Sequence, residues 1–240
     1  MVTFRRLETP YYLVSAFADL TMGQNKLVAR YPDGQYTYFH HNFSLIATNG
    51  AILEGMLKSL LSWRLMEIAE EAVENGLAAG QTGPSFAEHV LAKFRFTVET
   101  DAWTQLQNHY ATVFGMKFSS LASNSCMESL NHLMKLRNIT AHGSPIQLAN
   151  EELEADDDHF FYQLQQKYKA VSNYLVDKYG KDDLWDVLGN DNQVVKDFWL
   201  ATQELARGII ALANGEELPA PLQKLLDAII DYDWGYMRAV

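Results

Sequence analysis

Cysteine is almost absent from this chain, since Cys126 is the single cysteine in 240 residues. One thiol excludes an intramolecular disulfide framework and any zinc site built from several thiolates. Such sparing use of cysteine fits a reducing compartment, so we expect a cytoplasmic protein in which Cys126 fills space in the core.

Long apolar runs and an excess of positive charge are also missing. No stretch of 18 residues is free enough of polar and charged groups to span a bilayer. Arg5 and Arg6 resemble the start of a signal peptide, but Glu8, Pro10 and Asp19 interrupt the following residues. We therefore expect no membrane segment. The formal net charge of −11 means that any contact with nucleic acid needs a local basic patch.

The familiar signatures of several enzyme classes are lacking as well. There is no Gly-rich phosphate loop, no H-E-x-x-H and no G-x-S-x-G, which leaves nucleotide-hydrolysing, zinc-protease and serine-hydrolase functions without support. The range 150–158 holds six acidic residues in nine, and we interpret it as a solvated loop rather than a magnesium site. We expect neither a metal nor a cofactor.

What is present is an ordinary globular composition, 48% hydrophobic and 20% charged. Near the N-terminus, the range 27–31, the turn 32–34 and the range 35–40 have the pattern of strand, turn and strand. We predict a small β-hairpin here. Its tyrosines and phenylalanine suit the packing of a small sheet better than a platform for nucleobases, because no basic residues lie among them.

The rest of the chain has the three- and four-residue periodicity of helices. The predicted helices cover about 42–75, ending at Gly76, then 86–96, 102–142 with a break near Gly115 or at 119–125, 159–179, 181–188, 193–213 and 221–230. We expect a mainly α protein: an N-terminal hairpin appendage (1–41), an up-and-down helical bundle (42–180), and a C-terminal helical extension packed on the bundle (181–240).

The helix that ends near His142 has an apolar face and a polar face. On a helical projection the apolar face holds Cys126, Leu130, Leu133, Met134 and Ala141, and the polar face holds Asn131, Lys135, Asn138 and His142. Arg137 falls on the apolar side, where a cation needs a partner. Glu54, on the apolar stripe of the helix 42–75, is the candidate. Lys58 is an alternative partner for Glu54 at i,i+4 spacing.

His142 occupies the last helical turn before Gly143. Exposed carbonyls at a helix end favour the imidazolium form and should raise the pKa of His142, which suits a group that transfers protons near neutral pH. A histidine at this position is also a common way to cap a helix.

Arg137, Asn138, three further residues, His142 and Gly143 at a helix end resemble the R-X4-H signature of HEPN ribonucleases. The segment 51–61, which includes Glu54 and Lys58, is similar to the first long helix of that superfamily. The resemblance covers about residues 42–180. Ser144 stands where the branch controlled by tyrosine modification has a tyrosine, so that form of control is not expected.

The resemblance implies a metal-independent endoribonuclease that leaves 2′,3′-cyclic phosphate ends, acting as a toxin or an antiviral effector. It implies His142 as general acid or base, Arg137 as the stabiliser of phosphate charge, and Asn138 as a positioning group, with Glu54 and Lys58 in support. It also implies a homodimer whose two signatures line one cleft, where Lys135 and Asn131 contact RNA, and it leaves room for an antitoxin or regulatory protein.

Two alternatives remain open from sequence. In the first, the chain is a catalytically inactive HEPN-like module for protein interaction, in which Arg137 is a structural cation paired with Glu54. In the second, it is a helical protein of other ancestry that carries the short motif by chance.

Overall fold

The computed structural model describes residues 9–32, 37–80, 83, 85–141, 159–213 and 217–234. Within these ranges the chain is helical and contains no β-strand, which confirms the mainly α prediction. In chain order the elements are α1 (Thr9–Arg30), α2 (Phe39–Ala78), α3 (Phe86–Thr100), α4 (Trp103–Phe114), the 3₁₀ turn η1 (Phe118–Leu121), α5 (Asn124–Ala141), α6 (His159–Tyr179), α7 (Leu184–Gly189), α8 (Gln193–Leu212) and α9 (Ala220–Asp231).

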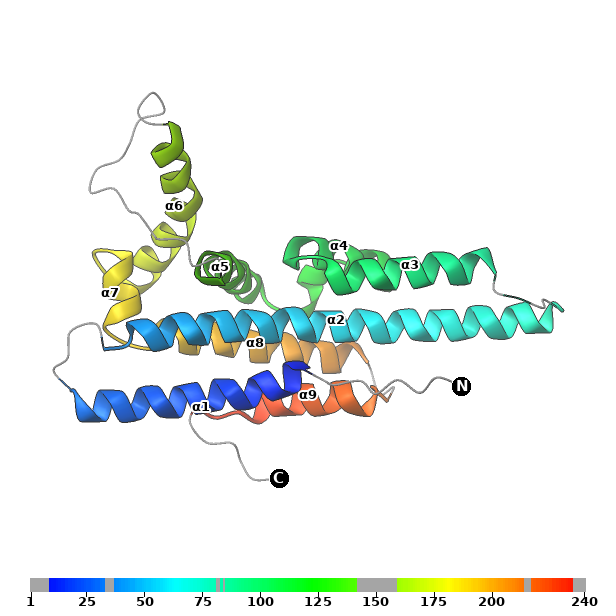
Figure 1. Ribbon diagram of the computed structural model, residues 1–240, viewed down its shortest axis with the longest axis horizontal. Helices are drawn as coiled ribbons and strands as arrows, with labels where there is room; N and C mark the ends of the chain where they lie inside the picture. The colour runs from blue at the N-terminus through cyan, green and yellow to red at the C-terminus, as the bar shows by residue number, and fades with distance from the viewer. Residues whose placement is uncertain are drawn as a thin grey trace.

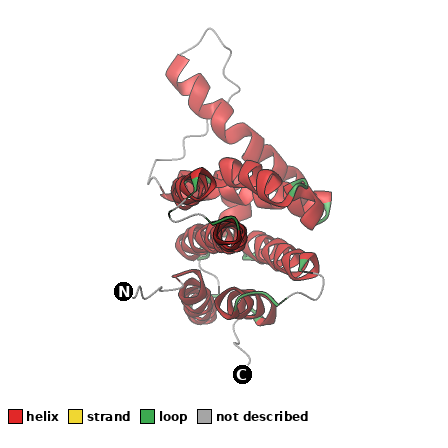
Figure 2. Ribbon diagram, turned by 90° about the vertical axis from the view of Figure 1, so that its right-hand side faces the viewer, coloured by secondary structure: helices red, strands yellow, loops and turns green. Residues whose placement is uncertain are grey.

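The long helix α2 runs through the middle of the molecule (Figure 1). It packs against α1, α8 and α9 as well as against α3, α4 and α5, and the end-on view of Figure 2 shows the helices stacked in successive tiers. Being covered on several sides, α2 is buried on more than one face between Leu45 and Leu65. The C-terminal part of α2 runs beside α3 (Figure 1), and no residue from 66 to 78 is buried.

The predicted N-terminal β-hairpin is wrong. The residues 27–30 belong to α1, and Phe39 and His40 begin α2, while 33–36 lie outside the described residues. In α1 the buried positions are Val14, Phe17, Ala18, Thr21 and Gln24, which recur at helical spacing and face α2 and α9. The helix that these positions define continues to Arg30. It therefore includes the start of the segment in which aromatic and turn residues predict a strand.

Some helix ends follow recognisable local chemistry. Ser85 begins α3 with a capping box, in which its side chain accepts from the backbone of Glu88 while the Glu88 carboxylate accepts from the backbone of Ser85. Gly115 ends α4 in the left-handed conformation, φ +68°, and so makes the predicted break in the range 102–142. The predicted stop at Gly76 falls two residues before the observed end of α2 at Ala78.

The helix α8 lies against α2, α5 and α9, so part of the C-terminal range contributes to the central core. Its buried side chains include Phe198, Trp199 and Leu205. Gln203 is also buried, and its amide donates to the carbonyls of Ile229 and Tyr232 at 2.9 and 3.0 Å. One side chain on α8 thereby satisfies backbone groups where α9 ends.

Two further buried amides connect distant parts of the chain. Asn42 on α2 donates to the carbonyls of Leu188 and Asp191, each at 2.7 Å, and accepts from the amide of Gln24 on α1. Because unpaired buried amides are costly, this network favours one relative placement of α1, α2 and α7.

Among the described helices, none combines the length and the apolar composition that a membrane-spanning helix needs.

Candidate functional site around Arg137

The helix α5 carries the arginine of the motif near its C-terminal end. Leu130, Leu133 and Met134 are buried as predicted, and Lys135 and Asn138 are exposed as predicted. Arg137 shares the face of the buried leucines Leu130 and Leu133, as predicted, yet 25% of its side chain is exposed. Its guanidinium is therefore held at the edge of the core, where it can meet both a buried partner and a ligand.

Arg137 is paired with Glu54 on α2. The distance from Arg137 Nη2 to Glu54 Oε2 is 2.8 Å, and the Glu54 side chain is only 14% exposed. The predicted meeting of these two residues is confirmed. The alternative i,i+4 pairing is not observed, because Lys58 Nζ instead donates to the backbone carbonyl of Glu99 on α3 at 3.0 Å.

A glycine makes room for the arginine. If Gly50 carried a Cβ, that atom would lie 2.5 Å from Arg137 Cγ and 2.9 Å from Arg137 Cβ, which is closer than real side chains approach. Gly50 and Glu54 are four residues apart on α2 and so share one face of the helix. Sequence reasoning missed Gly50, although a glycine one turn before a buried carboxylate is the signal that could have found it.

Asn138 contributes a second acceptor to the guanidinium. Its Oδ1 accepts from Arg137 Nη1 at 3.0 Å, and the residue is exposed. A guanidinium has five N–H donors, so the two observed bonds leave donors for an anion such as a phosphate. Glu54 and Asn138 thus hold the guanidinium in one orientation without using all of its donors.

The predicted catalytic histidine cannot be placed in the same way. His142 lies outside the described residues, as does the acidic run 150–158, and α5 is described to Ala141. The proximity of His142 to Arg137 and Asn138 therefore stays a prediction from their spacing along the chain.

The two predicted RNA contacts have different surroundings. Lys135 is exposed on α5. Asn131 is partly buried, and its Oδ1 accepts from Trp103 Nε1 at 2.9 Å and from Gln107 Nε2 at 3.1 Å. Asn131 thus connects α5 to α4, and its role as an RNA contact stays a prediction.

Another histidine, His132, lies on α5, five residues before Arg137. The ring of His132 stacks on Tyr174 of α6 with centroids 3.9 Å apart and planes 1° from parallel. Burial, and then the nearby charge of Lys135, lowers the pKa of His132, so the neutral imidazole is favoured. Tyr174 also shares a hydrogen bond with Ser129 at 2.8 Å, which makes this contact part of the α5–α6 packing.

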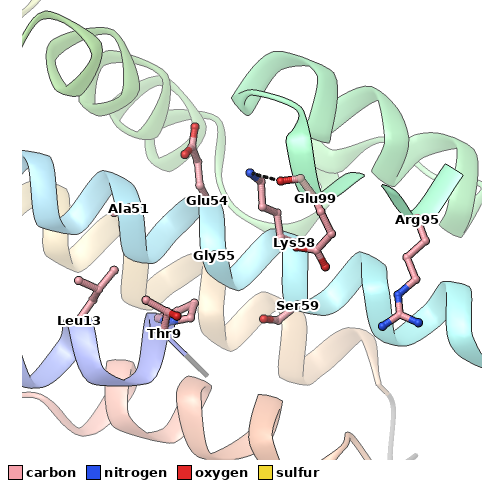
Figure 3. Close-up of a pocket in the computed structure, with 10 residues that line it drawn as sticks. Thr9, Leu13, Ala51, Glu54, Gly55, Lys58, Ser59, Arg95 and Glu99 are labelled. Carbon is pink, nitrogen blue, oxygen red and sulfur yellow. Dashed lines mark hydrogen bonds between the residues drawn. The ribbon is translucent and has the colours of Figure 1, made fainter. Parts of the chain in front are cut away.

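A pocket of about 580 Å³ adjoins the site (Figure 3). It is lined by Thr9, Pro10 and Leu13 of α1, by Ala51, Glu54, Gly55, Lys58 and Ser59 of α2, and by Arg95 and Glu99 of α3. Glu54 is common to the pocket and to the pair with Arg137. The sequence carried no signal for Arg95 or Thr9, because only the packing of three helices brings them together.

Comparison with known proteins adds no family to this picture. No protein-family model, no curated protein and no solved structure matches the chain. Among the described residues there is also no group of three histidine, cysteine, aspartate or glutamate side chains placed to hold a metal ion. The chemistry of the site therefore rests on its own residues.

Proposed function

We propose that this protein is a metal-independent endoribonuclease of the HEPN type. The observation that supports the proposal is the placement of Arg137, which Glu54 and Asn138 hold near the end of the helix that leads to His142 while part of its side chain stays exposed. An arginine fixed in this way is preorganised to bind the oxygens of a phosphate without rearrangement.

The proposed reaction is an internal transesterification of RNA. The ribose 2′-oxygen forms a bond to the adjacent phosphorus and loses its proton to a general base, while the bond from phosphorus to the 5′-oxygen breaks and that oxygen takes up a proton. The products are a 2′,3′-cyclic phosphate and a 5′-hydroxyl. Arg137 would stabilise the charge on the non-bridging oxygens, and His142 would transfer a proton.

A site with one histidine can supply either the base or the acid at one moment, and the reaction needs both. We therefore include in the proposal a pair of chains whose two copies of the motif face one cleft. Lys135, exposed on α5, would then contact the RNA backbone. Biological roles as a toxin or as an antiviral effector are both compatible with this activity.

One observation favours a second candidate function. The pair between Arg137 and Glu54 already neutralises the arginine at the edge of the core, which is what a purely structural cation needs. In that case the chain is an inactive helical module that binds other proteins, and Arg137 serves its stability alone.

The experiment that separates the two functions is cleavage of a mixed RNA pool in EDTA. We expect the wild type to cut RNA and to leave cyclic-phosphate ends, and we expect Arg137→Ala and His142→Ala each to lower the rate by about 100-fold or more. End-group analysis of the products and circular dichroism of each protein are the measurements.

The matched control is Arg207→Ala, which removes an exposed arginine of α8. It should cut RNA like the wild type. Equal cleavage by all four proteins would point to a contaminating nuclease, and no cleavage by a folded, dimeric wild type would favour the interaction module.

A further inference from the structure

The distal part of α2 and the neighbouring α3 form an arm that projects beyond the other helices (Figure 1). The arm consists of residues 66–78 of α2 and 86–97 of α3. Among the described residues, six of the eleven exposed large apolar side chains lie on this short part of the chain, namely Met66, Val73, Leu77, Phe86, Val90 and Phe96. Exposed apolar side chains gathered in one place mark a surface that meets a partner.

The outer face of α3 shows this exposure most clearly. Phe86 is 85% exposed and Phe96 is 70% exposed. The side chains through which α3 packs inward are different ones, since Val98 is buried and Leu91 is half-buried against the core. Packing on α2 therefore leaves both phenylalanines uncovered.

Each helix of the arm carries a row of side chains at alternating spacings of four and three residues. We call these rows the α3 seam, Phe86, Val90, Lys93 and Thr97, and the α2 seam, Met66, Glu70, Val73 and Leu77. This spacing places a row on one side of a helix and suits packing against a row of the same kind on another helix.

The surroundings of the two seams have opposite charge. The range 66–78 contains four glutamates and no lysine or arginine. The α3 seam contains Lys93 and is bordered by His89, and it has no carboxylate. Glu70 and Lys93 are both exposed, and neither has a charged partner within the described part of the chain. The seams are therefore complementary in charge as well as apolar.

An antiparallel contact matches the seams position by position. The charged residue is second in the α2 seam and third in the α3 seam, so this direction brings Glu70 opposite Lys93. The apolar positions then meet one another, as Val73 meets Val90. A parallel contact would instead set each charge against a valine, which is costly for a charge that loses water.

Within one chain the two seams do not cover each other. The α2 seam residues Met66 and Leu77 and the α3 seam residue Phe86 are all exposed, although α2 and α3 pack together. The complementary seam must therefore come from another molecule, and a second copy of this chain carries it.

We infer that the arm is a self-association surface, on which the α3 seam of one copy packs antiparallel on the α2 seam of a second copy, with Lys93 facing Glu70. This contact does not depend on RNA cleavage. It is also separate from a cleft between two copies of the motif, because Glu70 lies about 24 Å along α2 from Glu54.

The first test mixes two full-length variants, Val73→Cys and Val90→Cys, under mild oxidation. We expect a disulfide that links one chain of each variant, because the antiparallel contact sets these two positions opposite each other. Each variant alone should cross-link much less, since its cysteines would face valines. Cys126 is buried and should not take part. Non-reducing electrophoresis and mass spectrometry of the linked peptides are the measurements.

The matched control mixes Val73→Cys with Leu200→Cys, which places the second thiol at an exposed apolar position of α8 outside the arm. This pair should cross-link only at the background level. Cross-linking of the control to the same extent overturns the inference. Absence of a cross-link between Val73→Cys and Val90→Cys also overturns it, and the arm would then belong to a partner of another sequence.

The second test exchanges the charges and measures self-association by sedimentation equilibrium. Lys93→Glu should weaken association through the arm by about tenfold, because Glu70 would then face a like charge. The double variant Lys93→Glu/Glu70→Lys should restore it. Lys26→Glu, at an exposed position of α1, makes the same change in net charge and should associate as the wild type does. Equal association by Lys93→Glu and Lys26→Glu would contradict the proposed contact.

Discussion

At the scale of single residues, a charge on an apolar helix face predicts that an opposite charge lies on the face packed against it. Arg137 and Glu54 each lie among hydrophobic neighbours on their helices, and the structure joins them at 2.8 Å. Burying one charge alone would cost more than burying the pair, so each residue constrains where the other can lie. The same reasoning does not predict Gly50, because this residue carries no charge and contributes only by leaving space for the Arg137 side chain.

We expect Glu54→Gln to lower the free energy of unfolding by about 1–2 kcal/mol, because Arg137 would lose its counter-charge in a largely buried setting. Denaturation in urea measures this. If the ribonuclease proposal holds, RNA cleavage by the folded variant should also fall, since the arginine loses the group that positions it.

Glu71→Gln is the control for this substitution, as Glu71 is an exposed glutamate of the same helix. It should change the free energy of unfolding by less than about 0.5 kcal/mol. A Glu54→Gln protein as stable and as active as this control would contradict both parts of the prediction.

At the scale of elements, helix ends and periodicities were largely predictable, and one element was not. The range 159–179 matches α6, and Gly115 ends α4 in the left-handed conformation that glycine adopts easily. The N-terminal hairpin prediction is wrong because it depends on the aromatic residues and the turn 32–34, which favour strands only locally. The residues Val14, Phe17 and Thr21 have helical spacing, and their face is buried because α1 packs against α2 and α9.

Element packing also makes a test of α8 possible. A Cβ on Gly208 would lie 1.9 Å from the backbone oxygen of Leu121, so α8 and η1 approach more closely than alanine allows. We expect Gly208→Ala to lower the free energy of unfolding by about 2 kcal/mol, because backbone atoms cannot move aside as a flexible side chain can. Guanidinium denaturation is the measurement.

Arg207→Ala, next to it on the exposed side of α8, should be close to neutral in the same assay. Alanine is a better helix former than glycine, so a Gly208→Ala protein more stable than wild type would show that α8 can shift away from η1.

At the scale of the whole molecule, α2 and α8 form a shared interior to which helices from both ends of the chain attach. Cys126 is buried there, and its thiol donates to the carbonyl of Ala201 on α8. Burial, followed by the charge of Glu204, raises the pKa of Cys126 to about 12. The only cysteine therefore reports on the integrity of the core.

We expect the native protein to react very slowly with a thiol-specific disulfide reagent at pH 8 and to react rapidly once unfolded, because the thiolate is the reactive form. The raised pKa of Cys126 also means that the unfolded state loses the thiol proton first as pH rises. Its contribution to stability is thus present below the ordinary thiol pKa and is lost as pH rises toward about 12.

The control is a Ser120→Cys variant of the same chain, which adds a thiol at an exposed position of η1. One thiol should then react at once and the second only on unfolding. Rapid reaction of both in the native state would mean that the α5–α8 interface opens readily.

The sequence by itself determined the mainly α class, most helix positions and the pairing of Glu54 with Arg137, because periodicity and the cost of an unpaired buried charge act within or between single helices. Only the tertiary structure decided that the N-terminal segment is α1 and that Arg95, Ser59 and Thr9 line one pocket. Those outcomes depend on which helix faces meet, and such contacts join residues far apart in the chain whose local patterns do not refer to one another.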